Sequence, residues 1–341
     1  ATGDATGGPT DADNATTEGI NAVAQALGLF GEVVRLEAVA SFPHQLARAR
    51  PDLVFNMAEG LTGVNREAHV PAICEFLGVP YTGSDPLTLA LALHKARAKE
   101  ILSQHRVPTA PFAVVGTKSD LDRVNLPYPL FVKPVAEGSG KGIYVNNLCE
   151  SPERLRHRAL ALIEEYRQPV LVETYLPGRE FTVAILGNGP EARCLPLVAF
   201  DFTTLPPGAP PVYGYEAKWL WDTAEHQLEI YECPARVPGA VAREVAAVAL
   251  AGYHALGCRD WCRVDVRLDQ RGTPNVVELN PLPGILPDPR LNSCFPKAAR
   301  AAGYEYDDLI QEVVRIAWRR ITGRDIAPPV GTGEAAPHSA L

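Results

Sequence analysis

The sequence predicts a multi-domain protein of the α/β (α+β) class, and three observations support this prediction. The chain has 341 residues, more than one hydrophobic core usually serves. Short apolar runs alternate with helix-like segments over about the first 83 residues, as in strand–helix–strand units built on a mostly parallel sheet. Further along, strand patterns flank a glycine-rich loop and then a hairpin. We therefore expect two or three domains.

Composition and charge exclude several classes of protein. The chain is 46% hydrophobic and 21% charged, which is typical of globular proteins. A net charge of −8 argues against nucleic-acid binding, and no apolar run reaches the roughly 18 residues of a membrane span. The seven cysteines form no C-x-x-C pair, so neither a disulfide framework nor a zinc site is expected. No signal peptide is visible, so we expect a cytoplasmic location.

The first third of the chain begins with a segment, residues 1–17, whose Thr, Ala, Gly and Asp content predicts flexibility. Gly78 follows an apolar helical pattern and is a good helix-ending residue. The patterns predict helices over residues 21–29 and 67–77, and strands over 32–39, 52–57 and 79–82.

The middle of the chain opens with Asp85-Pro86, a capping residue followed by a first-turn proline. One helix is expected from there to about Val107. Ser151-Pro152 predicts a second capped helix, which should run to about Tyr166. Strands are expected over residues 130–135, 143–147, 169–175 and 180–186.

The last third contains a proline-rich stretch, residues 203–214, that we expect to be a surface loop. Gly257 should end an alanine-rich helix. A hairpin is expected where Gln270-Arg271-Gly272 separates two apolar runs. The predicted helices cover residues 241–256, 296–302 and 306–320, the hairpin strands cover 261–269 and 274–279, and the tail from residue 326 should be disordered.

The hairpin carries the most informative polar pattern. Side chains alternate along a strand, so Arg263, Asp265 and Arg267 share one face, as do Glu278 and Asn280 on the partner strand. Two carboxylates and an amide oxygen in one patch suit Mg²⁺ or Mn²⁺. The alternative is a solvated strand face with ordinary ion pairs.

The glycine-rich loop over residues 137–142 lies between predicted strands and contains Lys141. Its amides and its lysine suit an anion such as phosphate, although a plain hairpin loop is an equal alternative. The spacing matches neither the P-loop nor the dinucleotide fingerprint. Lys133 lies among apolar residues and needs either an anionic partner or an exposed strand face.

Two carboxylates near the next strand are suited to a nucleoside. Glu173 follows an apolar run and could accept a hydrogen bond from an amine-bearing ring, and Glu180 could bind a pair of ribose hydroxyls. Taken singly, each residue fits a surface carboxylate better than a nucleoside contact. The histidines form no H-x-x-x-H pattern, and no G-x-S-x-G elbow is present.

Taken in order, these segments resemble the D-alanine–D-alanine ligase family of the ATP-grasp superfamily, over about residues 50–320. The resemblance lies in LGVPYTGSDPLTLALALHKARAKEIL, PLFVKPVAEGSGKGIYV, VLVETYLPGREFTVAILG, YEAKWL, ALGCRDWCRVDVRLD and VVELNPLPG. It implies a three-domain ATP-grasp fold with the nucleotide sandwiched between the central and C-terminal sheets. The N-terminal parallel-sheet domain would cover residues 1–83, the central domain 84–174 and the catalytic domain 175–325.

The resemblance also implies a role for particular residues. Catalysis would involve Arg263 as the oxyanion donor, Lys218 near the γ-phosphate and the loop around Ser139 closing over the phosphates. The implied ATP contacts are Lys95, Lys133, Glu173, Tyr175, Leu176 and Glu180, and the implied ligands of two Mg²⁺ ions, or of Mn²⁺, are Asp265, Glu278 and Asn280.

The implied activity is ATP-dependent ligation of a carboxylate to an amine through an acyl phosphate. The chain departs from the family pattern near the substrates: Ala58-Glu59-Gly60 replaces an HG motif, and Pro287-Asp288-Pro289 replaces a serine- and histidine-containing stretch. Substrate contacts are expected from Glu59, Tyr215, Asp288 and Arg290, with amino-acid-like substrates and a homodimer. The alternatives are a true D-alanine–D-alanine ligase, a non-catalytic nucleotide-binding relative, or a structural α/β protein.

Overall fold

The computed structural model describes residues 17–222 and 227–326, the side chain of Trp219 excepted. The segments expected to be flexible or disordered lie outside these ranges, apart from Thr17 and Ile326. The α-helices are α1(Thr17–Leu27), α2(Phe42–Ala49), α3(His69–Leu77), α4(Pro86–Leu93), α5(Lys95–Gln104), α6(Pro152–Tyr166), α7(Gly239–Ala255), α8(Cys294–Ala301) and α9(Tyr306–Thr322). The strands are β1(Phe112–Val115), β2(Leu130–Pro134), β3(Leu148–Cys149), β4(Val170–Thr174), β5(Glu180–Leu186), β6(Arg193–Cys194), β7(Val198–Phe200), β8(Tyr231–Glu232), β9(Trp261–Leu268) and β10(Pro274–Asn280).

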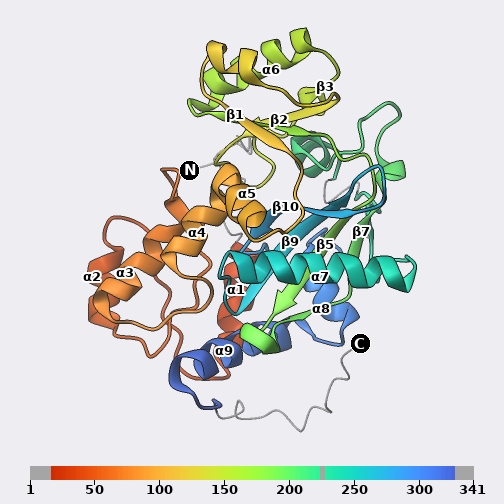
Figure 1. Ribbon diagram of the computed structural model, residues 1–341. Coiled ribbons are helices and arrows are strands. Elements are labelled where there is room, and N and C mark those ends of the chain that lie inside the picture. The colour runs from red at the N-terminus through yellow and green to blue at the C-terminus, as the bar shows by residue number, and fades with distance from the viewer. Residues whose placement is uncertain (1–16, 223–226, 327–341) are drawn as a thin grey trace, which may run out of the picture.

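The smaller sheet forms the upper lobe in Figure 1 and has the antiparallel order β1-β4-β2-β3. Helix α6 covers one face, where Val132 and Val172 pack with Leu162. Alternation along β2 and β4 turns Lys133 and Glu173 to the opposite face. The sheet is therefore apolar toward α6 and charged toward the rest of the molecule.

The larger sheet has the order β10-β9-β5-β7-β8, with β6 paired to β5. Helix α7 lies across one face, as Figure 1 shows, and packs on Cys262 and Val264 of β9. The other face is covered by α8, α9 and α1, where Trp261 packs near Phe295. The face that begins with Trp261 continues along β9 into charged residues, because every second side chain lies on it.

The N-terminal region differs from the expected strands. Residues 32–39 and 52–57 form no ladder, and the described part of this region has a single parallel bridge between Val54 and Tyr81. Val34 and Val39 are exposed because no described strand lies beside them. An apolar pattern along the sequence can suggest a strand, but it does not show that a second strand is present to pair with it. The helix around residues 67–77 is confirmed as α3, with Gly78 in the left-handed conformation.

The single helix expected from Asp85 to Val107 is in fact two helices, α4 and α5. His94 interrupts them with φ −88° and ψ 88°, and its imidazole Nδ1 accepts a hydrogen bond from the amide of Arg97. The amide of Lys95 then donates to the carbonyl of Val135 on the small lobe. A side-chain cap and a tertiary hydrogen bond therefore replace continuous helix at this point.

The strand expected at residues 143–147 is also absent. A 3₁₀ turn, Val145–Asn147, precedes the short strand β3. Buried Asn147 donates to the carbonyl of Gly142 and accepts from Nε of Arg158 at 2.7 Å. Such local side-chain hydrogen bonds compete with strand pairing. The hairpin and the helices expected near residues 151–166, 241–256, 296–302 and 306–320 are confirmed within a few residues.

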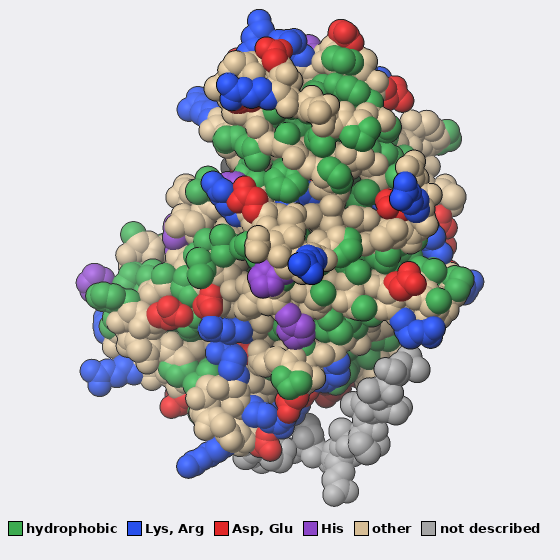
Figure 2. Space-filling view, viewed as in Figure 1, with side chains coloured by type: hydrophobic (Ala, Val, Ile, Leu, Met, Phe, Trp, Pro, Cys, Tyr) green, Lys and Arg blue, Asp and Glu red, His purple; other side chains and the backbone are tan. Residues whose placement is uncertain are grey.

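None of the described helices has both the length and the apolar character that a membrane span requires. On the face shown in Figure 2, acidic and basic side chains are interspersed.

Asp260 joins three parts of this fold just before β9. Its fully buried carboxylate accepts hydrogen bonds from the Gly83 amide, from Asn188 and from Nε and Nη2 of Arg320, each at 2.8 Å. A buried charge that loses its partner is strongly destabilising.

We predict that Asp260→Asn lowers the free energy of unfolding by about 3 kcal/mol, because the half-buried Arg320 guanidinium loses its fully buried counter-charge. Asparagine tolerates the positive φ of 64° at this position. Asp325→Asn is the control, since it removes an exposed partner of Arg319 and should cost less than about 1 kcal/mol. Equal losses in urea denaturation of the two variants would contradict the assignment.

Candidate active site

A pocket lies where the charged faces of the two sheets meet. Its described lining carries seven cationic and five anionic side chains, a surplus of two positive charges in a chain of net charge −8. The cations are Lys95, Lys99, Lys133, Lys141, Lys218, Arg263 and Arg267, and the anions are Glu137, Glu173, Glu180, Asp265 and Glu278.

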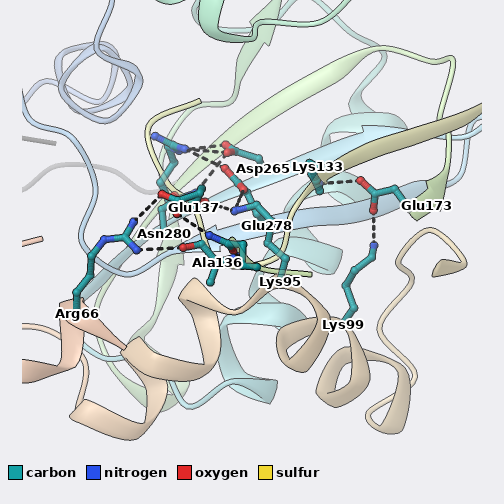
Figure 3. A network of polar contacts seen from close by, with 12 residues as sticks. Arg66, Lys95, Lys99, Lys133, Ala136, Glu137, Glu173, Asp265, Glu278 and Asn280 are labelled. Carbon is teal, nitrogen blue, oxygen red and sulfur yellow. Dashed lines mark hydrogen bonds and ion pairs between the residues drawn. The ribbon is translucent and has the colours of Figure 1, made fainter. Parts of the chain in front are cut away.

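Lys95 enters this pocket from the first turn of α5. Its Nζ lies 3.2 Å from Glu278 Oε2 on the large sheet and donates to the carbonyl of Glu137 in the glycine-rich loop. Figure 3 shows the side chain rising from the helix toward Glu278. The break at His94 places Lys95 at this junction, so one ammonium contacts the helix, the loop and the hairpin together.

Glu173 holds two lysines in the small lobe. Its carboxylate lies 2.9 Å from Lys99 Nζ and 2.7 Å from Lys133 Nζ, and all three side chains are buried (Figure 3). Burial alone would raise the pKa of Glu173, but the two ammonium groups lower it to about 2. Burial lowers the pKa of Lys99, whereas Glu173 and Glu278 raise that of Lys133 against its burial.

The hairpin brings the predicted polar patch together. Glu278 lies opposite Asp265 and Asn280 opposite Arg263, with a bulge between Val276 and Glu278. Arg263 grips Asp265 through Nε and Nη2 at 3.1 and 2.9 Å, and its Nη2 lies 3.6 Å from Glu278. Without the bulge, Glu278 would fall out of register with Asp265, so the extra residue aligns the two carboxylates.

The patch has the chemistry of a divalent-cation site. Within the described residues no three His, Cys, Asp or Glu side chains form a metal-binding group, but the predicted set holds two carboxylates and one amide. Burial would raise the pKa of Glu278, yet Lys95, Lys133, Arg263 and Lys218 hold it well below its ordinary value. Carboxylate and amide oxygen ligands of this kind fit Mg²⁺.

Lys218 and the glycine-rich loop meet over the pocket. Lys218 lies in a short π-helical segment, Ala217–Trp221, with Nζ 5.6 Å from the ring centre of Tyr213. Burial, and the charge of Arg263, lower its pKa. A Cβ on Gly140 would come 3.3 Å from the Lys218 side chain, so glycine lets the loop approach. Ser139, with φ 53°, lies between the pocket-lining Gly138 and Gly140.

Three of the residues predicted to bind the nucleoside lie together in the pocket lining. Tyr175 and Leu176 line it beside Glu180. Glu180, which was expected to bind a ribose, already has an ion-pair partner in the protein, since Nη1 of Arg267 lies 2.9 Å from Glu180 Oε2. Arg267 also donates to the hydroxyl of Tyr175 at 2.8 Å.

The four expected substrate residues do not line this pocket in the described structure. Asp288 and the exposed Arg290 bind each other, with Nη2 2.6 Å from Oδ2. Tyr215 packs on Tyr144 with ring centres 5.8 Å apart, and Glu59 is half-buried in the N-terminal region. The pocket wall near the hairpin is instead formed by Cys294 at the start of α8.

The family is decided by the sequence comparison. The family model described as "D-ala D-ala ligase C-terminus" matches residues 101–315. The chain belongs to the D-alanine–D-alanine ligase family.

Relatives of this family match most of the chain. A D-alanine–D-alanine ligase of Bordetella pertussis is 39% identical over 269 residues, 77% of this chain and 78% of that protein. The ligase of Cupriavidus metallidurans is 35% identical over 276 residues, 80% and 78% of the two chains. An uncharacterised protein of Sinorhizobium fredii is 37% identical over 286 residues, 83% and 80% of the two chains.

Solved structures show the same fold. The D-alanine–D-alanine ligase of Bacillus anthracis, solved as a complex with ATP, superposes with a TM-score of 0.66 at 23% identity, over 90% of this chain and 95% of that one. The VanG D-Ala:D-Ser ligase of Enterococcus faecalis gives 0.62 at 24% identity, over 78% and 73%. The ATP-grasp fold class is confirmed, with both β-sheets antiparallel.

Sequence reasoning missed several residues of this ligase-family pocket. Lys99 lies one helical turn after Lys95, a spacing that indicates a shared helix face. The sequence pattern puts Arg267 on the same strand face as Arg263 and Asp265 but assigns it no function. Tyr213 belongs to the stretch expected to be a surface loop, yet it lines the pocket with Tyr231. Cys294, for which the sequence predicts no role, lies there too, and burial raises the pKa of its thiol despite nearby Arg263.

We predict that Glu173→Gln destabilises the protein by about 3 kcal/mol at pH 7, since it leaves two buried ammonium groups unpaired. The carboxylate pKa is about 2 when folded and near 4.3 when unfolded. Its stabilising effect is therefore complete above about pH 5 and is lost as the pH falls toward 2.

Denaturant unfolding of wild type and variant between pH 7 and 2 measures this difference. Glu100→Gln is the control, because Glu100 pairs with Arg97 on an exposed helix surface and should show a difference below about 1 kcal/mol. A Glu173→Gln difference that stays constant down to pH 2 would contradict the charge pairing.

Proposed function

We propose that this protein is an ATP-dependent carboxylate–amine ligase, which joins amino-acid-like substrates through an acyl phosphate and releases ADP and phosphate. The observation that carries the proposal is the charge arrangement between the two sheets. Lys95 and Lys133 approach from the helix and the small sheet, and Asp265 and Glu278 face them from the hairpin. Membership of the ligase family supports the same conclusion.

The lysines are suited to the phosphates of ATP. Lys95 and Lys133 are buried, and their charges are now neutralised by Glu278 and Glu173. A polyphosphate entering the pocket would add negative charge where cations already outnumber anions, so the pocket field favours it over the negative charge of the whole chain. Tyr175, Leu176 and Glu180 would take the nucleoside.

Asp265, Glu278 and Asn280 are the residues that would hold Mg²⁺. From the family we expect two ions, and Mn²⁺ would suit the same ligands. Bound there, the metal would neutralise phosphate charge and polarise phosphoryl oxygens. Thr182 Oγ1 donates to Asp265 Oδ1 at 2.7 Å, and this hydrogen bond fixes the carboxylate orientation as second partners of metal ligands commonly do.

Arg263 is suited to stabilise the reaction's negative charge. A carboxylate is a poor electrophile, so transfer of the γ-phosphoryl group makes an acyl phosphate, which the amine attacks to give a tetrahedral oxyanion. Arg263 is fixed by Asp265 and Glu278 before substrate arrives, and preorganised donors of this kind lower the barrier. Lys218 and the loop around Ser139 would shield the phosphates from water.

The substrates are proposed as a class only. The alternative is a ligase that joins two D-alanine molecules. Asp288 and Arg290 pair with each other outside the pocket, and Cys294 and Tyr231 line it together with Arg263. Division at residues 83/84 and 174/175, a homodimer and a cytoplasmic location also stay predictions.

A substrate screen tests the proposal. Purified protein with Mg²⁺ and ATP is given pairs of amino acids, D-alanine included, and phosphate release is followed by mass spectrometry of the product. We expect phosphate release that requires both partners and a product one water lighter than their sum. ATP binding without phosphate release from any pair would support the non-catalytic alternative.

We predict that Arg263→Ala and Glu278→Ala each lower kcat at least about 100-fold, because loss of an oxyanion or phosphate-site group removes transition-state stabilisation. Cys258→Ala, a buried thiol behind the sheet in the α7 core, should keep turnover within about threefold. Near-normal turnover of Arg263→Ala would remove its assigned role.

A further inference from the structure

Arg267 has an unusual environment in the pocket, beside Glu180 and Tyr175. The side chain is only 6% exposed, yet it lines the pocket, and its Nε has no hydrogen-bond partner among the described residues. A buried donor without a partner is costly, and native proteins rarely leave one. A missing acceptor is therefore expected to come from whatever fills the pocket.

The rest of the guanidinium is fixed firmly. Nη1 donates to Glu180 at 2.9 Å, and Nη2 donates to the hydroxyl of Tyr175 and to the carbonyl of Pro211, both at 2.8 Å. These partners come from β5, from the connection after β4 and from the proline-rich loop. The group cannot turn to satisfy Nε internally without breaking one of these contacts.

The guanidinium also lies close to two aromatic rings. Its Cζ is 4.9 Å from the ring centre of Tyr175 and 5.4 Å from that of Phe202. Glu180 offsets its charge, so the site presents a flat, hydrogen-bonding surface among aromatic groups. Planar guanidinium groups stack well on nucleobases and present donors in a fixed direction.

The printed contacts of Arg267 differ from those of the lysine proposed for the phosphates. Arg267 contacts Glu180, Tyr175 and the carbonyl of Pro211, whereas Lys95 pairs with Glu278 of the proposed metal site. A phosphate there would meet Glu180 directly, which like-charge repulsion disfavours. A neutral, acceptor-bearing nucleoside fits better.

We propose that Arg267 is a nucleoside-binding residue, whose Nε donates to an acceptor on the base–ribose half of the nucleotide. This inference rests on the proposed ATP-binding function and adds a specificity-determining residue to it. Arg267 then links the nucleoside to Glu180 and to the proline-rich loop at Pro211, so that loop becomes part of the nucleotide site.

Calorimetric titration with ATP and with tripolyphosphate, both with Mg²⁺, tests the proposal. Tripolyphosphate keeps the phosphates and lacks the nucleoside. We expect Arg267→Met to raise the Kd of ATP at least about tenfold and to change the Kd of tripolyphosphate less than twofold. Arg267→Lys keeps the charge without the planar fork and should weaken ATP about fivefold or more.

Arg179→Met is the matched control, because Arg179 also stacks on an aromatic ring, Phe181, but lies outside the pocket and pairs with Glu232. It should leave both Kd values unchanged. Unchanged ATP affinity in both Arg267 variants, or equal weakening of ATP and tripolyphosphate, would overturn the inference. Failure of the wild type to bind ATP at all would instead overturn the proposed function.

If the Arg267 variants fail to fold, a measurement on the wild-type protein still tests the proposal. In protein labelled with ¹⁵N-arginine, the Nε–H resonance assigned to Arg267 should shift on addition of ATP and stay in place with tripolyphosphate. The same resonance unmoved by saturating ATP would contradict the donor role.

Discussion

Buried charge between two sheets is the constraint on which the rest of this structure depends. Each strand that enters the pocket is apolar on one face and charged on the other, so the helices α6 and α7 cover the outer faces and the charged faces meet. Unpaired, such charges would be very costly. Glu173 and Glu278 compensate the lysines, and the sheets are thereby held together at their polar faces.

This arrangement makes the pocket ready for a polyanion. Pairing within the protein keeps Lys95, Lys133 and Arg263 in place, so little reorganisation is needed when phosphate oxygens replace carboxylates as their partners. The acidic chain as a whole and the cationic surplus in the pocket are compatible, because burial lets the local charges dominate the local field.

The fold class could be predicted from the sequence, and most of the residues predicted for ATP binding, catalysis and metal binding line one pocket. The period-two pattern of Arg263 and Asp265, opposite Glu278 and Asn280, was enough to place them together, and ordered motifs indicated the family. The bulge at Val277 and the break at His94 could not be read, because each depends on tertiary hydrogen bonds and register. For the same reason the pairing of Arg267 with Glu180 stayed hidden, and residues 32–39 were wrongly expected to be a strand.

A crystal structure with Mg²⁺ and a non-hydrolysable ATP analogue tests the central claim most directly. We predict phosphate oxygens on Lys95 and Lys133, metal on Asp265 and Glu278, and the nucleoside beside Tyr175 and Arg267. Glu173 should keep Lys99 when Lys133 turns to phosphate. An analogue bound outside the space between the two sheets, with the internal ion pairs intact, would contradict the account.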